Sequence, residues 1–400
     1  MSTRRDFMKQ LSAVAGISAL SSLGLGVAAP RALAALGSTW YMPDESAVQQ
    51  RIFVAFAAKT SIWDTWATAV NNNVALIAKT IAKYQPVTVL CRSADLTKAK
   101  TACGTSTNIQ YMTMPLDDIW CRDYGGCFVV DGSGGRGLVD FNFNGWGGKQ
   151  TSTNDAYVAD EISSRTAADY IASQLTGEGG GIEVDGHGTA IMTESCWVNS
   201  NRNPGWTKAQ IEAELKANLG LRKIIWLPGI KGKDITDAHV DFYARFASKG
   251  VVIANLDNDP KSYDYQVTRT HLPILQNATD ADGVKLTVHT MSPPTKVRSN
   301  QYTQNNPDWA PGYINYLPIN GAVLVPQFGD TTADAAAKNL LAKLYPGRAI
   351  VQLNIDPIAA GGGGIHCVSK NMPKVYGESH AQGRLALCMS CRVQQPFSCR

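Results

Sequence analysis

Helical and strand patterns alternate along the chain after residue 35, and this alternation is the strongest constraint on its fold. Helices are predicted where apolar residues recur every three or four positions, at 64–84, 156–175, 208–219 and 333–344. Strands are predicted where short apolar runs lie between turn residues, at 87–91, 128–131, 138–143, 182–184, 224–227, 251–255, 286–291, 323–326 and 349–354. No low-complexity linker interrupts the pattern, so residues 35–373 are expected to form one α/β domain.

Two architectures are compatible with this alternation. One is a doubly wound parallel sheet with helices on both faces. The other is a propeller built from separate strand–helix modules, which has the same order of elements. The chain has 400 residues, 44% of them hydrophobic, so it can bury a large core in either case.

The first 34 residues have the pattern of a cleavable export signal. Arg4 and Arg5 precede an apolar run that ends at an Ala-Leu-Ala site, residues 32–34. Paired arginines at this position are typical of a twin-arginine signal. A membrane-spanning helix is the alternative, but Pro30 interrupts the apolar run. We therefore predict a twin-arginine signal peptide and a mature protein exported to the periplasm or beyond.

The net charge of the chain excludes some classes of partner. The formal charge is +4, and residues 1–34 contain four basic residues and one acidic residue. The rest of the chain therefore carries a net charge of only +1. Such a protein has no charge pattern typical of nucleic-acid binding or of anchoring to an anionic membrane. Its partners are expected among small molecules and peptides.

Nine cysteines follow the predicted signal, and the odd number leaves at least one thiol unpaired even in an oxidising compartment. Cys388, Cys391 and Cys399 lie in a C-terminal tail, residues 374–400. This spacing could serve zinc, but a second ligand pair at the usual spacing is missing. We therefore expect a disulfide or plain thiols in the tail, and no metal site.

Cys367 follows a run of four glycines, residues 361–364. Consecutive glycines allow the backbone to approach a ligand closely and leave its N–H groups free to face a reaction centre. A thiol in such a loop can be a nucleophile if its pKa is lowered. A buried structural cysteine beside a flexible loop is the alternative.

A second cluster consists of Asp237, His239 and Asp241. Because strand side chains alternate, an extended backbone would point all three to one face. An imidazole between carboxylates suits acid–base catalysis or metal binding. An ordinary hydrogen-bonded histidine is the alternative.

A third cluster, residues 117–125, places Trp120 among acidic residues that include Asp123. Carboxylates accept the guanidinium fork, and an indole can stack on a planar cation. A solvated turn with ion pairs has the same composition. Glu178, which precedes three glycines, is by itself a weak signal.

Taken together and in this order, these segments resemble the agmatine deiminase and bacterial-type (Porphyromonas-type) peptidylarginine deiminase family of the guanidino-group-modifying superfamily. The resemblance covers about residues 40–373. It rests on the motifs at 118–125, 141–148, 178–180, 193–194, 199–204, 225–228, 239–241, 312–315, 325–329 and 362–367.

This resemblance implies a pentein-type β/α propeller, in which five ββαβ-like modules surround a central active-site cavity. It also implies the roles of the site residues. The implied catalytic residues are Cys367 as nucleophile, His239 as acid–base and Glu178 as the acid that assists binding and proton transfer. The implied substrate-binding residues are Asp123, Asp241, Trp120 and Asn315.

The implied reaction is hydrolytic deimination, in which a guanidinium loses ammonia through an S-amidine on Cys367, with no metal or organic cofactor. Agmatine, free arginine and peptidyl-arginine are rival substrates. Gly126 replaces a proline common in the family, and residues 42–46 lack the tryptophan typical of agmatine deiminases. Export would suit a deiminase of peptides. Amidine transfer to an acceptor amine and a non-catalytic exported binding protein are the remaining alternatives.

Overall fold

The computed structural model describes residues 40–376. The predicted signal peptide and the three tail cysteines lie outside these residues, and what was inferred for them stays a prediction. No helix in the described part of the chain is long and apolar enough to cross a bilayer. The described cysteines, all with free thiols, are Cys91, Cys103, Cys121, Cys127, Cys196 and Cys367.

Five separate β-sheets share one connection pattern, an antiparallel pair of strands followed by a parallel pair. The first sheet consists of β16 (Ser369–Pro373), β1 (Gln49–Phe56), β2 (Val87–Cys91) and an extra strand, β3 (Ile109–Thr113). The other four sheets consist of β4 (Cys127–Val130), β5 (Arg136–Asp140) and β6 (Asp169–Ala172); β7 (Glu183–Val184), β8 (Thr189–Thr193) and β9 (Lys223–Leu227); β10 (Ala244–Ser248), β11 (Val251–Asn255) and β12 (Thr287–Met291); β13 (Leu317–Ile319), β14 (Ala322–Pro326) and β15 (Ala349–Leu353).

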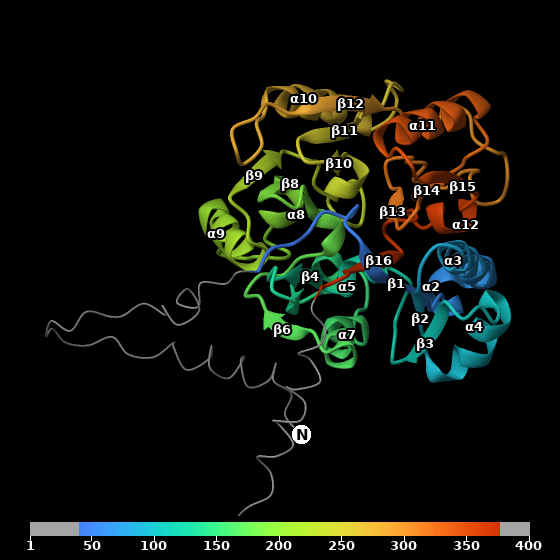
Figure 1. Ribbon diagram of the computed structural model, residues 1–400. Helices are drawn as coiled ribbons and strands as arrows, with labels where there is room; N and C mark the ends of the chain where they lie inside the picture. Colours follow the sequence, from blue (N-terminus) through green and yellow to red (C-terminus); the bar gives the residue numbers. More distant parts are fainter. Residues whose placement is uncertain (1–39, 377–400) are drawn as a thin grey trace, which may run out of the picture. The chain divides into compact units, whose positions relative to one another are not determined.

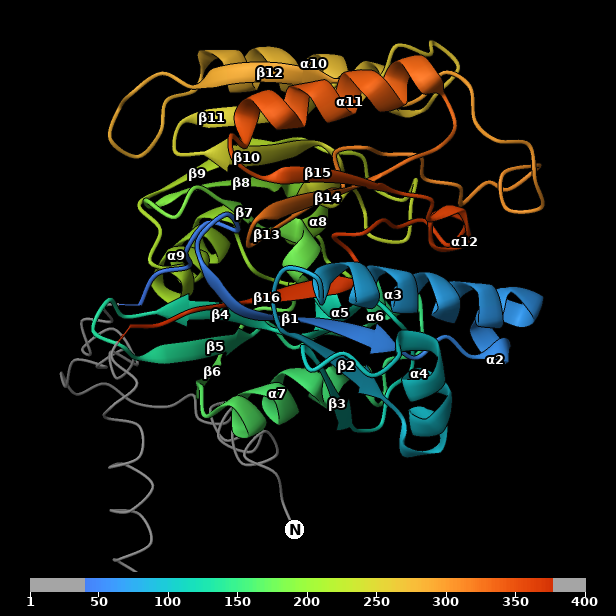
Figure 2. The same ribbon diagram turned by 45° about the vertical axis from the view of Figure 1, so that its right-hand side comes forward.

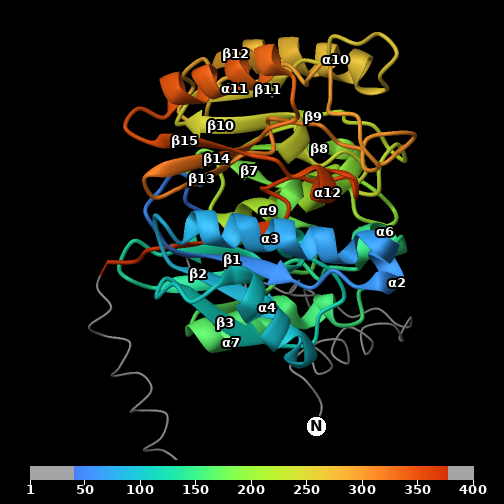
Figure 3. The ribbon, with the colours of Figure 1, turned by 90° about the vertical axis from the view of Figure 1, so that its right-hand side faces the viewer.

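One long helix joins the parallel strands of each module, because parallel strands need a crossover connection. These helices are α3 (Ala67–Ile81), α7 (Val158–Thr166), α9 (Lys208–Leu219), α10 (Asp264–Asn277) and α11 (Thr331–Leu344). Figure 1 shows the modules around a common centre with the helices outside, and Figure 3 shows α11 outside β13–β15. The pentein-type propeller is confirmed. The doubly wound sheet is wrong, because no sheet in the described residues extends beyond one module.

Short helical turns fill the remaining connections, and several of them carry the predicted site residues. They are α2 (Thr60–Trp63), η2 (Asp64–Trp66), η3 (Ser93–Asp95), α4 (Leu96–Cys103), α5 (Cys121–Tyr124), α6 (Gly145–Gly148), η4 (Asp155–Tyr157), η5 (Gly179–Gly181), α8 (Glu194–Trp197), η6 (Val240–Phe242) and α12 (Asp356–Ala359).

The first module is completed by strands from opposite ends of the described chain. β16 pairs antiparallel with β1, from Gln49 opposite Pro373 to Val54 opposite Ser369. Figure 2 shows the two strands side by side. Because Cys367 lies just before β16, this pairing fixes the position of the loop that carries the thiol.

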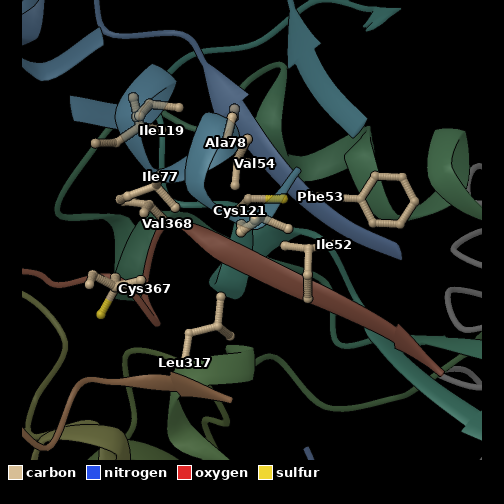
Figure 4. Packing of buried hydrophobic residues seen from close by; sticks show 14 of the residues in the cluster. Ile52, Phe53, Val54, Ile77, Ala78, Ile119, Cys121, Leu317, Cys367 and Val368 are labelled. Atoms are coloured by element: carbon tan, nitrogen blue, oxygen red, sulfur yellow. The ribbon is translucent and has the colours of Figure 1, made fainter. Parts of the chain in front are cut away.

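Apolar burial holds the outer helices on their sheets. In α3, Val70, Val74, Ile77 and Ile81 recur every three or four residues and are all fully buried. Burial of one such side chain stabilises the fold by about 1.5–3 kcal/mol. Cys367 lies at the edge of the same cluster, and its sulfur points away from Ile77 (Figure 4).

Helix α9 begins and ends where the sequence predicts. Thr207 and Gln210 form a reciprocal capping box at its N-terminus. Gly220 ends the helix in the left-handed conformation, which glycine adopts without steric cost. Local signals alone are enough to place this element.

The predicted helix at 156–175 is wrong in its second half. Helix α7 ends at Thr166, and Ala167 has a positive φ of 52°. Residues 169–172 form β6 instead, because they pair in parallel with β5. A non-local strand pairing has overridden the helical periodicity.

Candidate active site

The five residues predicted to carry the chemistry come from short turns of different modules. Asp123 lies in α5, Glu178 lies just before η5, and His239 and Asp241 lie at η6. Cys367 lies between α12 and β16. The exposed fraction of each residue is 6% or less. The fold therefore brings these polar groups together out of contact with bulk water.

Gly180 shows how closely three of these groups converge. A Cβ atom at this position would lie 2.5 Å from Nδ1 of His239, 2.8 Å from Oδ1 of Asp123 and 3.2 Å from Oδ2 of Asp241. Any side chain would occupy the space between them, so the site requires glycine at this position. The glycine run after Glu178 thus has a steric reason.

The thiol of Cys367 lies against Asn315 and Asp241. Nδ2 of Asn315 is 3.2 Å from Sγ, and Oδ2 of Asp241 is 3.6 Å from Sγ. Burial raises the pKa of Cys367 well above its usual value, and the charges of Asp241 and Asp123 raise it further. Without a bound cation the sulfur is therefore a thiol, so the lowered pKa expected of a nucleophile has to come from a ligand.

Asn315 also shapes the loop that carries Cys367. Its Oδ1 accepts hydrogen bonds from the backbone N–H groups of His366, at 3.0 Å, and Cys367, at 3.3 Å. A Cβ atom at Gly364 would lie 2.4 Å from the same oxygen. The glycine loop is therefore closely packed on Asn315, whose side chain lies directly at the thiol. Its contact with a substrate stays a prediction.

His239 is held on one side by Glu178. Nε2 of His239 lies 3.2 Å from Oε2 of Glu178, and Nε of Arg202 lies 2.9 Å from both oxygens of Glu178. Burial opposes the charged imidazolium, but Asp123 and a bond to Cys196 raise the pKa of His239 well above its usual value. His239 is therefore protonated at neutral pH. Its Nδ1 faces the other way, 3.7 Å from Oδ1 of Asp123.

The carboxylates of Asp123 and Asp241 complete the site. Asp123 accepts hydrogen bonds from Nε1 of Trp146, at 2.9 Å, and from the backbone N–H of Gly180, at 3.0 Å. Burial raises the pKa of Asp123. Oδ2 of Asp241 lies 2.7 Å from Nδ1 of His366. Burial alone would raise the pKa of Asp241, but this bond helps to hold it below its usual value.

Two buried polar atoms show what the site can accept. Oδ1 of Asp241 and Nδ1 of His239 have no hydrogen-bond partner among residues 40–376. Buried polar groups in folded proteins are almost always paired. In the same part of the chain, Asp123 and Asp241 form no ion pair with lysine or arginine. The arrangement therefore fits a cationic ligand whose N–H groups bond to the two carboxylates.

Trp120 lies on the wall formed by the glycine loop. Its ring packs against Gly363, where a Cβ atom would lie 2.1 Å from Cζ3, and its centroid is 5.8 Å from that of Trp63. Nε1 of Trp120 donates a 3.1 Å hydrogen bond to Asp118. The ring is therefore fixed beside the loop, and its stacking on a substrate stays a prediction.

Asp237 does not join the site, so the prediction of three side chains on one face is wrong. Asp237 and Ala238 have positive φ values of 60° and 69°, and a 3-10 helix follows. The backbone is therefore not extended. Asp237 pairs instead with Arg202 and Lys149, each at 2.8 Å. It supports the site only through Arg202.

Comparison with known proteins identifies the family. The sequence profile of the Porphyromonas-type peptidyl-arginine deiminases matches residues 41–373. The chain belongs to this family. Its relatives include the agmatine deiminases of Stutzerimonas stutzeri and Pseudomonas fluorescens SBW25, each 34% identical over 84% of this chain and over 96% and 95% of their own lengths.

Solved structures agree with this assignment. The agmatine deiminase of Enterococcus faecalis superposes with a TM-score of 0.78 at 28% identity, over 84% of this chain and 96% of that chain. This member of the Porphyromonas-type peptidyl-arginine deiminase family is a hydrolase of guanidino carbon–nitrogen bonds. Hydrolysis is thereby favoured over amidine transfer and over a non-catalytic binding role.

Sequence reasoning about this deiminase missed several residues that contact the predicted ones. Arg202 lies in the 199–204 motif, so the motif could have indicated it. His366 stands next to Cys367 but was not singled out. Glu45 has no local signal, since its partner His366 lies 321 residues later in the chain.

Proposed function

We propose that this deiminase hydrolyses agmatine to N-carbamoylputrescine and ammonia, with Cys367 as the nucleophile. The observation that carries the proposal is the convergence of Cys367, His239, Asp123 and Asp241 around one buried space at Gly180. A guanidinium is the planar cation whose N–H groups match two carboxylates.

Binding is the first step. The two carboxylates offset the cost of removing the guanidinium from water and orient its central carbon toward sulfur. The free Oδ1 of Asp241 is available to accept one of its N–H groups. The positive charge of the substrate also opposes the effect of both carboxylates on Cys367, so binding itself favours the thiolate, with release of the thiol proton to solvent.

Chemistry follows in two halves. The thiolate of Cys367 attacks the guanidinium carbon, and His239 gives the proton on Nδ1 to the nitrogen that leaves as ammonia. The product of this half is an S-amidine on Cys367. Water, deprotonated by the now neutral His239, then attacks the same carbon, and the C–S bond breaks to release a ureido product and the thiol. Glu178 holds His239 at Nε2 throughout.

Agmatine is chosen as substrate because the relatives at 34% identity are named agmatine deiminases and align over nearly their whole length. The test compares agmatine, free arginine and a blocked arginine peptide, with ammonia and the ureido product measured. We expect kcat/KM to be at least about tenfold higher for agmatine. A preference for the peptide would overturn the substrate, and ammonia from none of the three would overturn the catalytic roles.

We also propose that the protein is exported through its predicted twin-arginine signal. The pair Arg4 and Arg5 before an apolar run supports this. Replacing both arginines with lysine should leave unprocessed protein in the cytoplasm of a bacterial host. Export equal to that of the parent would show that the pair is not read as such a signal.

A further inference from the structure

A second buried thiol lies behind His239. Cys196, in α8, places Sγ 3.6 Å from Oε2 of Glu178. Nε2 of His239 lies 3.2 Å from the same oxygen. The three ligand atoms all lie within 4.8 Å of one another, and all three residues are buried. The thiol thus lies on the Nε2 side of the imidazole, whereas Asp123 lies on the Nδ1 side.

Two of the three separations are close to those of a tetrahedral zinc site. Zinc binds imidazole nitrogen, carboxylate oxygen and thiolate sulfur at about 2.0–2.3 Å, so tetrahedral ligands lie about 3.3–3.6 Å apart. The two measured separations, 3.2 and 3.6 Å, are close to this range before any adjustment. A thiolate with an imidazole also favours zinc over magnesium or calcium.

We propose that Glu178, Cys196 and His239 form an inhibitory binding site for a zinc ion. Binding forms bonds from zinc to Sγ, Nε2 and Oε2 and releases two protons to solvent, one from the thiol and one from the imidazolium. The charge of the pocket is unchanged, because a dication replaces two protons. Nε of Arg202 lies 2.9 Å from both oxygens of Glu178, so zinc on Oε2 would displace one of these contacts and leave the one to Oε1.

The predicted effect is on turnover, and it rests on the proposed roles of His239 and Glu178. A zinc ion on Nε2 holds the ring as a neutral imidazole. Its remaining proton, on Nδ1, is much less acidic than that of the imidazolium, so His239 no longer protonates the leaving ammonia effectively. Asp123 and Asp241 are not ligands and stay free to bind the guanidinium. Zinc should therefore lower kcat while changing KM for agmatine little.

Metal binding is tested first, without reference to activity. Equilibrium dialysis against zinc, and against cobalt(II) as a spectroscopic probe, compares the parent with Cys196→Ala and Cys367→Ala. We expect the parent and Cys367→Ala to bind one equivalent more metal than Cys196→Ala, with a cobalt–thiolate charge-transfer band. Tail cysteines contribute equally to all three proteins. Equal binding by Cys196→Ala overturns the site, and loss of binding in Cys367→Ala moves the metal to the nucleophile.

Inhibition is tested second. Relative to its own turnover without zinc, Cys196→Ala should need at least about tenfold more zinc for half-inhibition, whereas Cys103→Ala, which removes a buried thiol in α4, should stay as sensitive as the parent. If Cys196→Ala does not fold, Cys196→Ser replaces it. Equal sensitivity of the Cys196 variant overturns the inhibitory role. Absence of any deiminase activity would contradict only the proposed function, since the dialysis result stands apart from it.

Discussion

His366 holds Asp241 from behind the site, with Nδ1 of the imidazole 2.7 Å from Oδ2 of the carboxylate. The other ring nitrogen lies 2.9 Å from Oε2 of Glu45, which also pairs with Arg122 and Arg245. Burial and the charges of Arg122 and Arg245 lower the pKa of His366, while its contacts with Glu45 and Asp241 oppose this effect. The bond to His366 fixes Oδ2 of Asp241, and Oδ1 stays free for a ligand.

The first prediction concerns this support. His366→Ala should lower kcat/KM by about 30–150-fold, the equivalent of ~2–3 kcal/mol for a charged hydrogen bond. Most of the loss should be a higher KM, because His366 orients Asp241 without touching the substrate. His366→Asn keeps a donor near the position of Nδ1 and should recover part of the loss. Steady-state kinetics on both variants provide the test, and identical losses would contradict the orienting role.

A second prediction concerns the two carboxylates of the site. Asp123→Asn and Asp241→Asn keep the shape but remove the charge that compensates a buried cation. Each should reduce kcat/KM by about a thousandfold or more, which corresponds to ~4 kcal/mol of transition-state stabilisation. Asp160→Asn, an exposed position on α7, is the matched control and should change almost nothing. If the site variants behave like this control, the guanidinium assignment fails.

The reactivity of Cys367 gives a third prediction. Because burial and two carboxylates raise the pKa of this thiol, little thiolate is present at neutral pH without a cation. Neutral iodoacetamide should therefore react slowly at pH 7 and faster as the pH rises above the usual thiol pKa. Cationic chloroacetamidine should react much faster at pH 7, since it supplies the missing charge. Peptide mapping of the alkylated residue checks this, and equal rates for the two reagents would count against it.

The fourth prediction concerns stability against pH. His271 is buried, its Nε2 accepts the N–H of Gly229 at 3.1 Å, and burial lowers its pKa to about 4. In the unfolded chain its pKa is about 6.5. Stability is therefore full above about pH 6.5 and falls as the pH drops toward 4, because the unfolded state binds the proton more tightly. At pH 5 the loss from this residue should be about 2 kcal/mol.

Urea unfolding at pH 7 and pH 5 measures this loss. His271→Gln keeps an acceptor for the N–H of Gly229 but cannot titrate, so the difference between the two pH values should shrink by about 2 kcal/mol. His187→Gln, at an exposed position, is the matched control. An unchanged difference in His271→Gln would show that other groups cause the pH dependence.

The elements that the sequence predicts correctly are those with local signals. Helix α9 has its capping residues within its own segment, Thr207 and Gly220, and its boundaries follow from them. The segment 169–172 has no such signal, because it becomes a strand only through its partner β5. Periodicity reports the neighbours of a residue along the chain and not those across a sheet.

The site shows the same division. His239 and Asp241 could be predicted because both lie within one short motif that resembles the family's. Asp237 was placed wrongly because the prediction assumed an extended backbone. The spacing of Asp237, His239 and Asp241 does not show that Asp237 has a left-handed backbone conformation. Glu45 was missed because its hydrogen bond with His366 joins residues that are far apart in the sequence and forms only when the ring has closed.

Because β16 closes the ring, the enzyme becomes active only after nearly the whole chain has been synthesised. A growing chain that has reached residue 360 already contains His239, Asp123 and Asp241. It still lacks Cys367, the proposed nucleophile, and β16, the strand that pairs with β1. The same logic makes any premature stop upstream of Cys367 a complete loss of function, however much of the propeller has formed.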